Sequence, residues 1–426
     1  YAISPLLPRL LAPCRDLDTA VRELGWLRGY VRGRVGPEGK RGQAVALLLK
    51  RLVKERARGV PLQYLLGTEF FGELEIACAR GVLIPRPETA ASTSHLAHLL
   101  LHTTQPLPRE LRLLDLCTGS ACIPLLFQHE LGKSRQDVHV RALGVDICPR
   151  ALRLARWNLR RVRGRAGGFA GRGRIELVRA DVLGCSSGNG GRVSRRGSTS
   201  SVGGEDADVV PVLALPLAME STSQPLTWDI VISNPPYISP RHFWSTTMKA
   251  VRNWEPRIAL VPSASGNHFS PSSSPSSSSS PRHFPRVASS KNVDKHDHGN
   301  KGTNEKILSG SNDDDDARAD SFYPYLITHA RRLQAKILLL EVADLAQALR
   351  VARLATQLGG FEGVEIWRDE PGSGDNGDAG ADTKESTEGV GTEEHGYKFF
   401  GRGGARSVVC WRGVGGAWLG KREMGG

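Results

Sequence analysis

The stretch Leu111-Arg-Leu-Leu-Asp-Leu-Cys-Thr-Gly-Ser-Ala121 contains a short apolar strand followed at once by a tight turn around Gly119. We expect a helix to begin after this turn, from residue 123 onward. A glycine turn between a strand and a helix lets backbone N–H groups approach a ligand, and it directs the helix N-terminus toward that ligand. The stretch therefore predicts an α/β fold with a binding site at the carboxyl end of the strand.

Four more strands are predicted further along the chain. They cover residues 138–145, 174–178, 228–233 and 336–342, and a helix is expected over residues 151–159. Strands that alternate with helices imply a parallel sheet covered on both faces. The predicted fold class is therefore α/β, with a Rossmann-like sheet.

The chain divides into a helical first part and a larger α/β part. Apolar residues recur at helical spacing in the first 60 residues, so residues 1–67 are predicted to form a small all-helical domain. Residues 68–90 alternate like a hairpin and end in the rigid loop Ile84-Pro-Arg-Pro-Glu-Thr89, which makes them a hinge. Residues 91–426 then form the sheet domain. Three Ser-, Gly- or Asp-rich segments lack the apolar content to fold and are predicted to be disordered inserts, near residues 184–224, 263–320 and 372–394.

The composition argues against several classes of protein. No apolar run approaches the roughly 18 residues that a membrane span needs, so we expect no membrane association. The seven cysteines are scattered without paired short spacing, which predicts neither a disulfide framework nor a metal site. The formal net charge of +13 suggests an acidic partner, a ribosome-rich setting or a basic organelle matrix. We interpret the arginine-rich residues 150–179 as a solvated helix face rather than a dedicated RNA-binding patch.

The turn around Gly119 indicates the type of cofactor. Asp146 ends the next predicted strand, where a carboxylate can accept both hydroxyls of a ribose. A dinucleotide site uses several glycines to admit a pyrophosphate, but Cys117 and Ala121 occupy two of those positions here. This favours a cofactor without phosphates, such as S-adenosylmethionine, over NAD or FAD. A parallel-sheet protein with no ligand at this turn remains an alternative.

The segment Ser233-Asn-Pro-Pro-Tyr-Ile238 follows the apolar strand 228–233 directly. Its two prolines fix the local backbone and remove two N–H donors. The Asn234 carboxamide and the Pro235 carbonyl can then accept the two N–H groups of a planar amide or exocyclic amino group, while Tyr237 stacks on its plane. This geometry suits methyl transfer to an amide or amino nitrogen. The alternative is a proline-stiffened strand exit with a capping asparagine.

With these motifs, the chain resembles the HemK/PrmC family, the glutamine methyltransferases of peptide chain release factors, in its mitochondrial-type, eukaryotic form. The resemblance extends over Pro61-Leu-Gln-Tyr64, over Gly81-Val-Leu-Ile-Pro-Arg-Pro-Glu-Thr89 and over Glu255-Pro-Arg-Ile-Ala-Leu260. It implies a class I methyltransferase fold preceded by a helical domain. The chain departs from the family pattern where alanine replaces a more usual residue, at Ala90, Ala121 and Ala343.

The resemblance also implies roles for single residues. The expected catalytic residues are Asn234, Pro235 and Tyr237. The expected S-adenosylmethionine-binding residues are Asp115, Thr118, Gly119, Ala121, Asp146, Asp181 and Asn234. The expected substrate-binding residues are Arg86, Glu88, Pro236 and Tyr237.

By resemblance, the substrate is the glutamine of a Gly-Gly-Gln motif in a release factor, which the helical domain would grip. Nucleic acid is not directly required. A mitochondrial location is favoured over a cytoplasmic one, because relatives that carry such a helical domain serve the mitochondrial factor. Two alternatives stay open: an exocyclic-amino methyltransferase of DNA or RNA, and a non-catalytic S-adenosylmethionine-fold binding protein, for which Ala121 is the motivating feature. An NAD-dependent oxidoreductase is disfavoured, because hydride transfer has no use for the Asn-Pro-Pro-Tyr segment.

Overall fold

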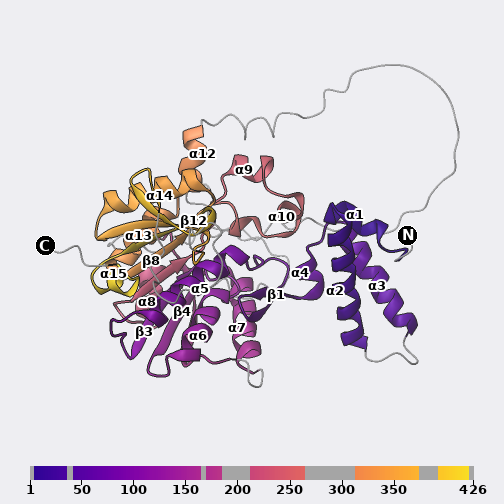
Figure 1. The fold of residues 1–426 in the computed structure, drawn as a ribbon, viewed down its shortest axis with the longest axis horizontal. Coiled ribbons are helices and arrows are strands. Elements are labelled where there is room, and N and C mark those ends of the chain that lie inside the picture. The colour runs from indigo at the N-terminus through magenta and orange to yellow at the C-terminus, as the bar shows by residue number, and fades with distance from the viewer. Residues whose placement is uncertain are drawn as a thin grey trace, which may run out of the picture.

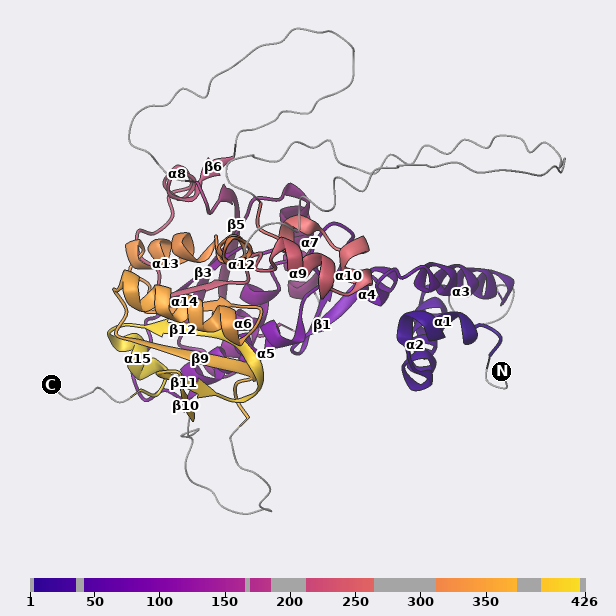
Figure 2. The same ribbon diagram turned by 90° about the horizontal axis from the view of Figure 1, so that it is seen from above.

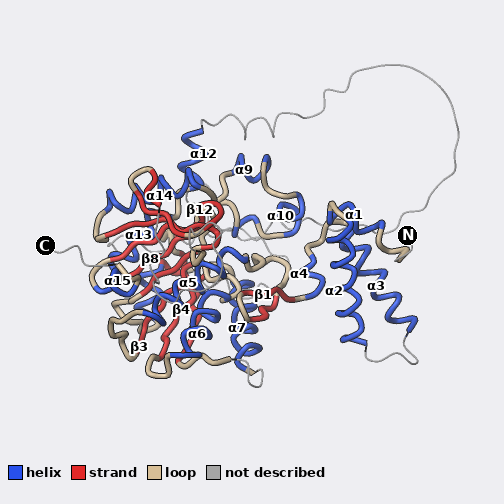
Figure 3. Tube along the Cα trace, in the orientation of Figure 1, coloured by secondary structure: helices blue, strands red, loops and turns tan. Residues whose placement is uncertain are grey.

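A twisted sheet with helices on both faces forms the larger part of the protein, and a group of N-terminal helices lies to one side of it (Figure 1). The computed structural model describes residues 4–35, 42–164, 169–184, 212–263, 312–373 and 392–421. The strands gather in the centre of the larger part and the helices surround them, whereas the N-terminal group holds helices and loops alone (Figure 3). The predicted α/β class and the helical N-terminal part are therefore confirmed.

The N-terminal group contains α1 (Pro8–Cys14), α2 (Leu17–Val35), α3 (Gly42–Ala57) and α4 (Leu62–Leu66). Its small core includes Leu10, Leu24, Leu27 and Val53, all nearly inaccessible to solvent. A buried ion pair reinforces the packing of α2 against α3. The Arg56 guanidinium donates to both carboxylate oxygens of Glu23, at 2.6 and 2.8 Å. The antiparallel hairpin of β1 (Thr68–Phe71) and β2 (Leu74–Ala77) then leads to the larger part (Figure 2).

The central sheet has the strand order β10-β11-β9-β12-β8-β7-β3-β4-β5-β6 within the described residues. Its middle is parallel and consists of β3 (Glu110–Leu116), β4 (His139–Asp146), β5 (Gly173–Asp181), β7 (Ile230–Ser233) and β8 (Ile337–Glu341). The short β6 (Leu213–Ala214) extends one edge. At the other side, β12 (Arg402–Trp411) runs antiparallel between β8 and β9 (Gly363–Glu370), followed by β11 (Tyr397–Phe400) and β10 (Thr392–Glu394).

The buried residues on the two faces of the sheet form two hydrophobic cores. One core lies under α5 (Pro87–His102), α6 (Cys122–Ser134) and α15 (Val414–Trp418), and the end of α7 (Pro149–Arg163) packs against it. The other lies under α8 (Leu215–Ser221), α13 (Tyr323–Arg332) and α14 (Leu345–Leu358). Successive residues of a strand point to opposite faces, so Leu113 enters the first core and Leu114 the second. Both are fully buried, which explains why the central strands are apolar throughout.

The sequence did not predict the C-terminal strands β9 to β12. β12 is antiparallel to both β8 and β9, with register irregularities against β9 between Arg402 and Ser407. β10 is antiparallel to β11, whereas β11 runs parallel to β9. The sheet is therefore mixed rather than purely parallel. The strand predicted over residues 174–178 is longer than expected and spans Gly173–Asp181.

The three predicted inserts lie largely outside the described residues, but their predicted ends are wrong. The first was expected to reach residue 224, yet β6 and α8 lie within it, and Leu215, Ala218 and Met219 of α8 are buried in a core. The second includes α12 (Asn312–Ala319), and the third includes β10. The predicted inserts included these short elements because polar segments lie next to them in the sequence. The apolar residues of α8, however, pack against the sheet.

None of the described helices is long and apolar enough to cross a membrane.

Candidate active site at the carboxyl edge of the sheet

The turn after β3 brings the predicted cofactor loop against the end of β4. The Thr118 N–H donates to the Val145 carbonyl at 2.9 Å, which fixes the loop to the neighbouring strand. The Gly119 N–H donates to Asp146 Oδ2 at 2.9 Å, and the Cys148 N–H donates to Oδ1 of the same carboxylate at 2.8 Å. Desolvation raises the pKa of Asp146 above its ordinary value. Asp146 therefore joins the turn after β3 to the turn after β4.

Ala121 adopts an unusual backbone conformation at the start of α6. Its φ is 62° and its ψ is 27°, which lie in the left-handed region that glycine adopts most readily. The residue is fully buried, so its methyl group offers no accessible surface. The departure from glycine at this position therefore changes the backbone energy more than the surface offered to a ligand.

Asp115 is a fully buried carboxylate with one unsatisfied oxygen. Its Oδ2 accepts a hydrogen bond from the Thr118 hydroxyl at 2.5 Å, while Oδ1 has no hydrogen-bond partner among the described residues. Burial raises the pKa of Asp115 to about 8. A buried acceptor without a donor is costly, so a ligand that presents a donor or a positive charge would be stabilised here.

Three carboxylates lie at the ends of three adjacent strands: Asp115 on β3, Asp146 on β4 and Asp181 on β5. Asp181 is buried, and its Oδ1 accepts from the Leu183 N–H at 2.9 Å. The oxygens of such a row accept hydrogen bonds from hydroxyl and amino groups, and an ionised member also attracts a cation, whereas a phosphate brings further acceptors and no donor. The row fits the ribose, amine, adenine and sulfonium groups of S-adenosylmethionine better than a pyrophosphate cofactor.

The Asn-Pro-Pro-Tyr segment begins where β7 ends, beside the cofactor loop. The Ser233 hydroxyl donates to the Leu116 carbonyl at 2.8 Å, which joins the ends of β7 and β3. Asn234 Nδ2 donates to the Thr89 hydroxyl at 3.1 Å. Pro235 and Pro236 are buried, and Tyr237 is half-buried. The predicted catalytic asparagine therefore lies at the same edge of the sheet as the three carboxylates.

Two residues without a predicted role connect this segment to the rest of the site. Glu341, at the end of β8, is buried and accepts from the Thr89 hydroxyl at 2.5 Å and from the Tyr237 hydroxyl at 3.1 Å. Burial raises the pKa of Glu341 to about 7 and also raises the pKa of Tyr237. The sequence feature that could have indicated a role for Glu341 is an acidic residue at the end of an apolar strand. For Thr89, the sequence feature is its position at the end of the proline-containing segment 84–89.

The predicted substrate-binding residues Arg86 and Glu88 lie at the start of α5. The Arg86 guanidinium donates to Glu255 Oε1 at 2.8 Å, and the Ile84 N–H donates to Oε2 of the same carboxylate at 3.1 Å. Glu255, whose side chain is 2% exposed, therefore fixes the loop before α5. Glu88 is half-buried, and its charge contributes to the raised pKa of Glu341. Contact of Arg86 or Glu88 with a substrate stays a prediction.

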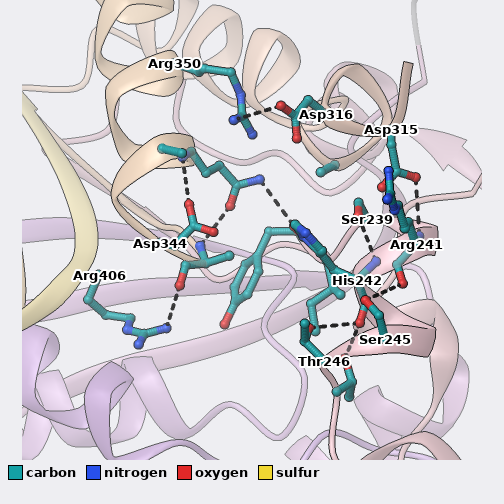
Figure 4. Close-up of a pocket in the computed structure, with 17 residues that line it drawn as sticks. Ser239, Arg241, His242, Ser245, Thr246, Asp315, Asp316, Asp344, Arg350 and Arg406 are labelled. Carbon is teal, nitrogen blue, oxygen red and sulfur yellow. Dashed lines mark hydrogen bonds and ion pairs between the residues drawn. The ribbon is translucent and has the colours of Figure 1, made fainter. Parts of the chain in front are cut away.

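A polar cavity of about 810 Å³ lies beside the catalytic segment, between α9 (Pro240–Ser245), α12 and α14 (Figure 4). Gln347 of α14 spans its inner wall: its amide donates to the Tyr237 carbonyl at 3.2 Å and to Asp320 at 2.8 Å. Charged groups of both signs line the cavity, among them Arg241, Asp315, Asp316, Asp344, Arg350 and Arg406. Several of these charges are paired with one another, as Arg350 is with Asp316 at 3.2 Å.

No group of three or more His, Cys, Asp or Glu side chains that could hold a metal ion occurs in the described part of the chain.

No family model matches the chain. It is 32% identical over 272 residues to the probable MRF1 mitochondrial N(5)-glutamine methyltransferase mtq1 of Schizosaccharomyces pombe, covering 63% of this chain and 72% of that protein. It is 28% identical over 262 residues to the mitochondrial MRF1 N(5)-glutamine methyltransferase MTQ1 of Saccharomyces cerevisiae, covering 61% and 64%. The release factor glutamine methyltransferase of Chlorobaculum tepidum is 30% identical over 208 residues, covering 49% and 55%.

Among solved structures, the METTL16 MTase domain resembles this chain with 12% identity and a TM-score of 0.35, over 85% of this chain and 80% of that one. A putative class I S-adenosylmethionine-dependent methyltransferase from Listeria monocytogenes gives 12% identity and a TM-score of 0.32, over 93% and 73%. Because these scores are low, the fold is assigned from the strand order and the sequence relatives.

Proposed function

Because this chain belongs to the release factor glutamine methyltransferases, we propose that it methylates a mitochondrial peptide chain release factor. The methyl group would pass from S-adenosylmethionine to the side-chain amide nitrogen of the glutamine in the Gly-Gly-Gln motif. The protein is a methyltransferase, as its relatives are named. A direct assay tests two features of this reaction: which glutamine accepts the methyl group and which release factor is the substrate.

The position of Asn234 carries the proposal. The Ser233 hydroxyl joins β7 to β3, so Asn234 lies next to the loop that contains Gly119. A methyl donor bound over the carboxylates Asp115 and Asp146 would therefore have its reactive end close to the Asn234 carboxamide. Such proximity is what a transfer between two bound groups requires.

The chemistry needs orientation more than a strong base. An amide nitrogen is a poor nucleophile, because its lone pair is delocalised into the carbonyl. The Asn234 and Pro235 oxygens would accept the two N–H groups of the substrate glutamine and direct its lone pair toward the donor, since both acceptors are preorganised. S-adenosylmethionine, when bound, supplies the electrophilic methyl group. The proton of the amide can leave after the transfer.

The mitochondrial assignment rests on the names of the two yeast relatives, both of which are called mitochondrial and MRF1-directed. The N-terminal helices α1 to α4 are proposed to contact the release factor. They lie beside the larger part of the protein and expose apolar side chains on their surface, including Trp26 at 56% and Leu47 at 70%. Exposed large apolar residues of this kind are common where a protein partner binds.

The test is methyl transfer from labelled S-adenosylmethionine to a purified mitochondrial release factor. A variant factor with Gly-Gly-Ala in place of Gly-Gly-Gln, bulk DNA and bulk tRNA are assayed in parallel. Label on the intact factor alone is the expected result. Label on the Gly-Gly-Ala factor would contradict the target residue, and label on nucleic acid would assign the protein to the amino-group methyltransferases of DNA or RNA.

A further inference from the structure

We propose that Thr89 and Glu341 are positioning residues that decide which end of the Asn234 carboxamide faces the substrate. The inference rests on the proposed function, because it concerns how the same site accepts an amide. Neither residue would contact the reacting atoms. Both would act through Asn234, along a series of hydrogen bonds that runs from Glu341 at the end of β8, through Thr89 of α5, to the Asn234 carboxamide.

The two ends of a carboxamide have nearly the same shape but opposite hydrogen-bonding character. The oxygen accepts hydrogen bonds and the NH₂ group donates them. Only the oxygen can accept hydrogen bonds from the N–H groups of a substrate amide. An asparagine side chain turned by 180° about its last bond would present its own NH₂ donors to those N–H groups instead. The rigid backbone at Pro235 and Pro236 places Asn234 but does not choose between its two ends.

The hydrogen bonds of Thr89 make this choice. An ionised carboxylate can only accept, so the single hydroxyl hydrogen of Thr89 is directed to Glu341 Oε2, at 2.5 Å. The Thr89 oxygen then has lone pairs alone to offer to Asn234, and it accepts from Nδ2 at 3.1 Å. The amide oxygen of Asn234 is consequently left to face the substrate. This oxygen makes no hydrogen bond to any of the described residues.

Glu341 is itself held in place, so that it can direct the hydrogen bond of the Thr89 hydroxyl. It lies at the end of β8, is buried, and receives a second hydrogen bond from the Tyr237 hydroxyl at 3.1 Å. The Tyr323 hydroxyl of α13 donates to its backbone carbonyl at 2.9 Å, which fixes the strand end. Charged and titratable groups from several elements act on Glu341: Arg86 and Glu88 at the start of α5, Tyr237 after β7, Tyr323 of α13 and Arg406 of β12.

The direction of the hydrogen bonds from Glu341 to Asn234 depends on whether Glu341 is protonated. A protonated Glu341 could donate to the Thr89 oxygen, and the Thr89 hydroxyl would then be free to donate to the oxygen of Asn234. The carboxamide would turn its NH₂ group to the substrate. Because burial raises the pKa of Glu341 to about 7, the rate of methyl transfer should rise as the pH increases through about 7.

The first experiment compares kcat, KM and cofactor affinity in variants of Thr89. Thr89→Val keeps the shape of the side chain and removes the hydroxyl, and it should lower kcat by about 100-fold, the loss expected for one oriented hydrogen-bonding group in an active site. KM for the release factor and the dissociation constant of S-adenosylmethionine should change little. Thr89→Ser should restore most of kcat. Ser92→Ala is the matched control. It removes another buried hydroxyl of α5, which forms a hydrogen bond with Ser407 and takes no part in the hydrogen bonds between Glu341, Thr89 and Asn234.

The second experiment measures the pH dependence of kcat in Glu341→Gln. The amide at this position cannot ionise, so the rise in kcat near pH 7 should disappear and kcat should no longer depend on pH in this range. An unchanged profile in Glu341→Gln, or wild-type kcat in Thr89→Val, would overturn the inference. A loss in Thr89→Val that Thr89→Ser does not restore would also overturn it.

A third measurement does not depend on activity. The side-chain NH₂ resonances of Asn234, observed by ¹⁵N NMR in the wild-type protein and in Thr89→Val, should shift when the hydrogen bond to Thr89 is lost. If the wild type fails to methylate the release factor, the proposed function is wrong, and the NMR result still decides whether Thr89 holds Asn234. Identical Asn234 resonances in the two proteins would contradict the positioning role.

Discussion

Replacing Glu255 should loosen the loop that leads into α5. Glu255→Ala removes the carboxylate that accepts from the Arg86 guanidinium at 2.8 Å and from the Ile84 N–H at 3.1 Å. Ile84 is buried at 3% exposure, so its N–H would be left without a partner, which costs about 1–3 kcal/mol. The Arg86 side chain is 28% exposed and can recover part of its hydration, so its loss is smaller, about 1 kcal/mol.

The two contributions together predict a loss of about 2–4 kcal/mol in the free energy of unfolding. For a domain of this size, that corresponds to a fall in Tm of about 5–12 °C, measured by circular dichroism. Glu255→Gln keeps one acceptor oxygen and should show about half of the effect. Because the loop leads into the first turn of α5, which carries Thr89, kcat should fall in Glu255→Ala even at temperatures where the variant is folded.

Glu110→Gln is the control for this experiment. Glu110 also pairs with an arginine, Arg112 at 3.0 Å, but its side chain is 46% exposed, and such pairs contribute about 0–1 kcal/mol. Its Tm should therefore remain within about 2–3 °C of the wild type. If Glu255→Ala and Glu110→Gln unfold at the same temperature, the buried contacts of Glu255 do not stabilise the loop and the reasoning is refuted.

Three further substitutions test the site. Asn234→Ala should lower kcat by about 100-fold or more while isothermal titration calorimetry shows unchanged affinity for S-adenosylmethionine; parallel losses of both would argue against an orienting role. Asp146→Ala should weaken that affinity by about 10–100-fold, because the acceptor of the Gly119 and Cys148 N–H groups is lost together with the predicted ribose contact; an unchanged dissociation constant would contradict the cofactor assignment. Ala121→Gly should leave the affinity within about twofold, because the methyl group is fully buried and offers no accessible surface to a ligand. Relief of the left-handed strain, about 1–2 kcal/mol, acts on the free energy of unfolding, where the greater freedom of glycine in the unfolded chain offsets it. A large gain in affinity for Ala121→Gly would show instead that the alanine impairs the cofactor loop.

The sequence predicted the parts of the site that depend on short segments. A strand, a glycine turn and a helix follow one another within residues 111–134, and an acidic residue ends the next strand at Asp146. Parallel strands place their carboxyl ends at one edge, so Asp115, Asp146 and Asn234 could be expected near one another before any contact was known. Their roles toward cofactor and substrate remain predictions.

Other features could not be predicted, because they join residues far apart in the chain. Thr89 and Glu341 are separated by 252 positions, and no sequence motif contains both residues. Arg86 and Glu255 are separated by 169 positions, so the sequence suggested a substrate contact for an arginine that pairs with a buried glutamate. The antiparallel strand β12 was missed for a similar reason: its place between β8 and β9 depends on pairing at both edges.

The sequence by itself determined the fold class and the type of chemistry, and it predicted the edge of the sheet at which the site lies, because each depends on local periodicity and on residue types at short spacing. Only the tertiary structure decided that the Asn234 carboxamide is held by Thr89, that Thr89 is directed by Glu341 and that Glu255 fixes the loop before α5. These contacts arise from packing α5, β7 and β8 together. The direction of a hydrogen bond depends on which donors and acceptors packing brings within reach, and spacing along the chain does not reveal it.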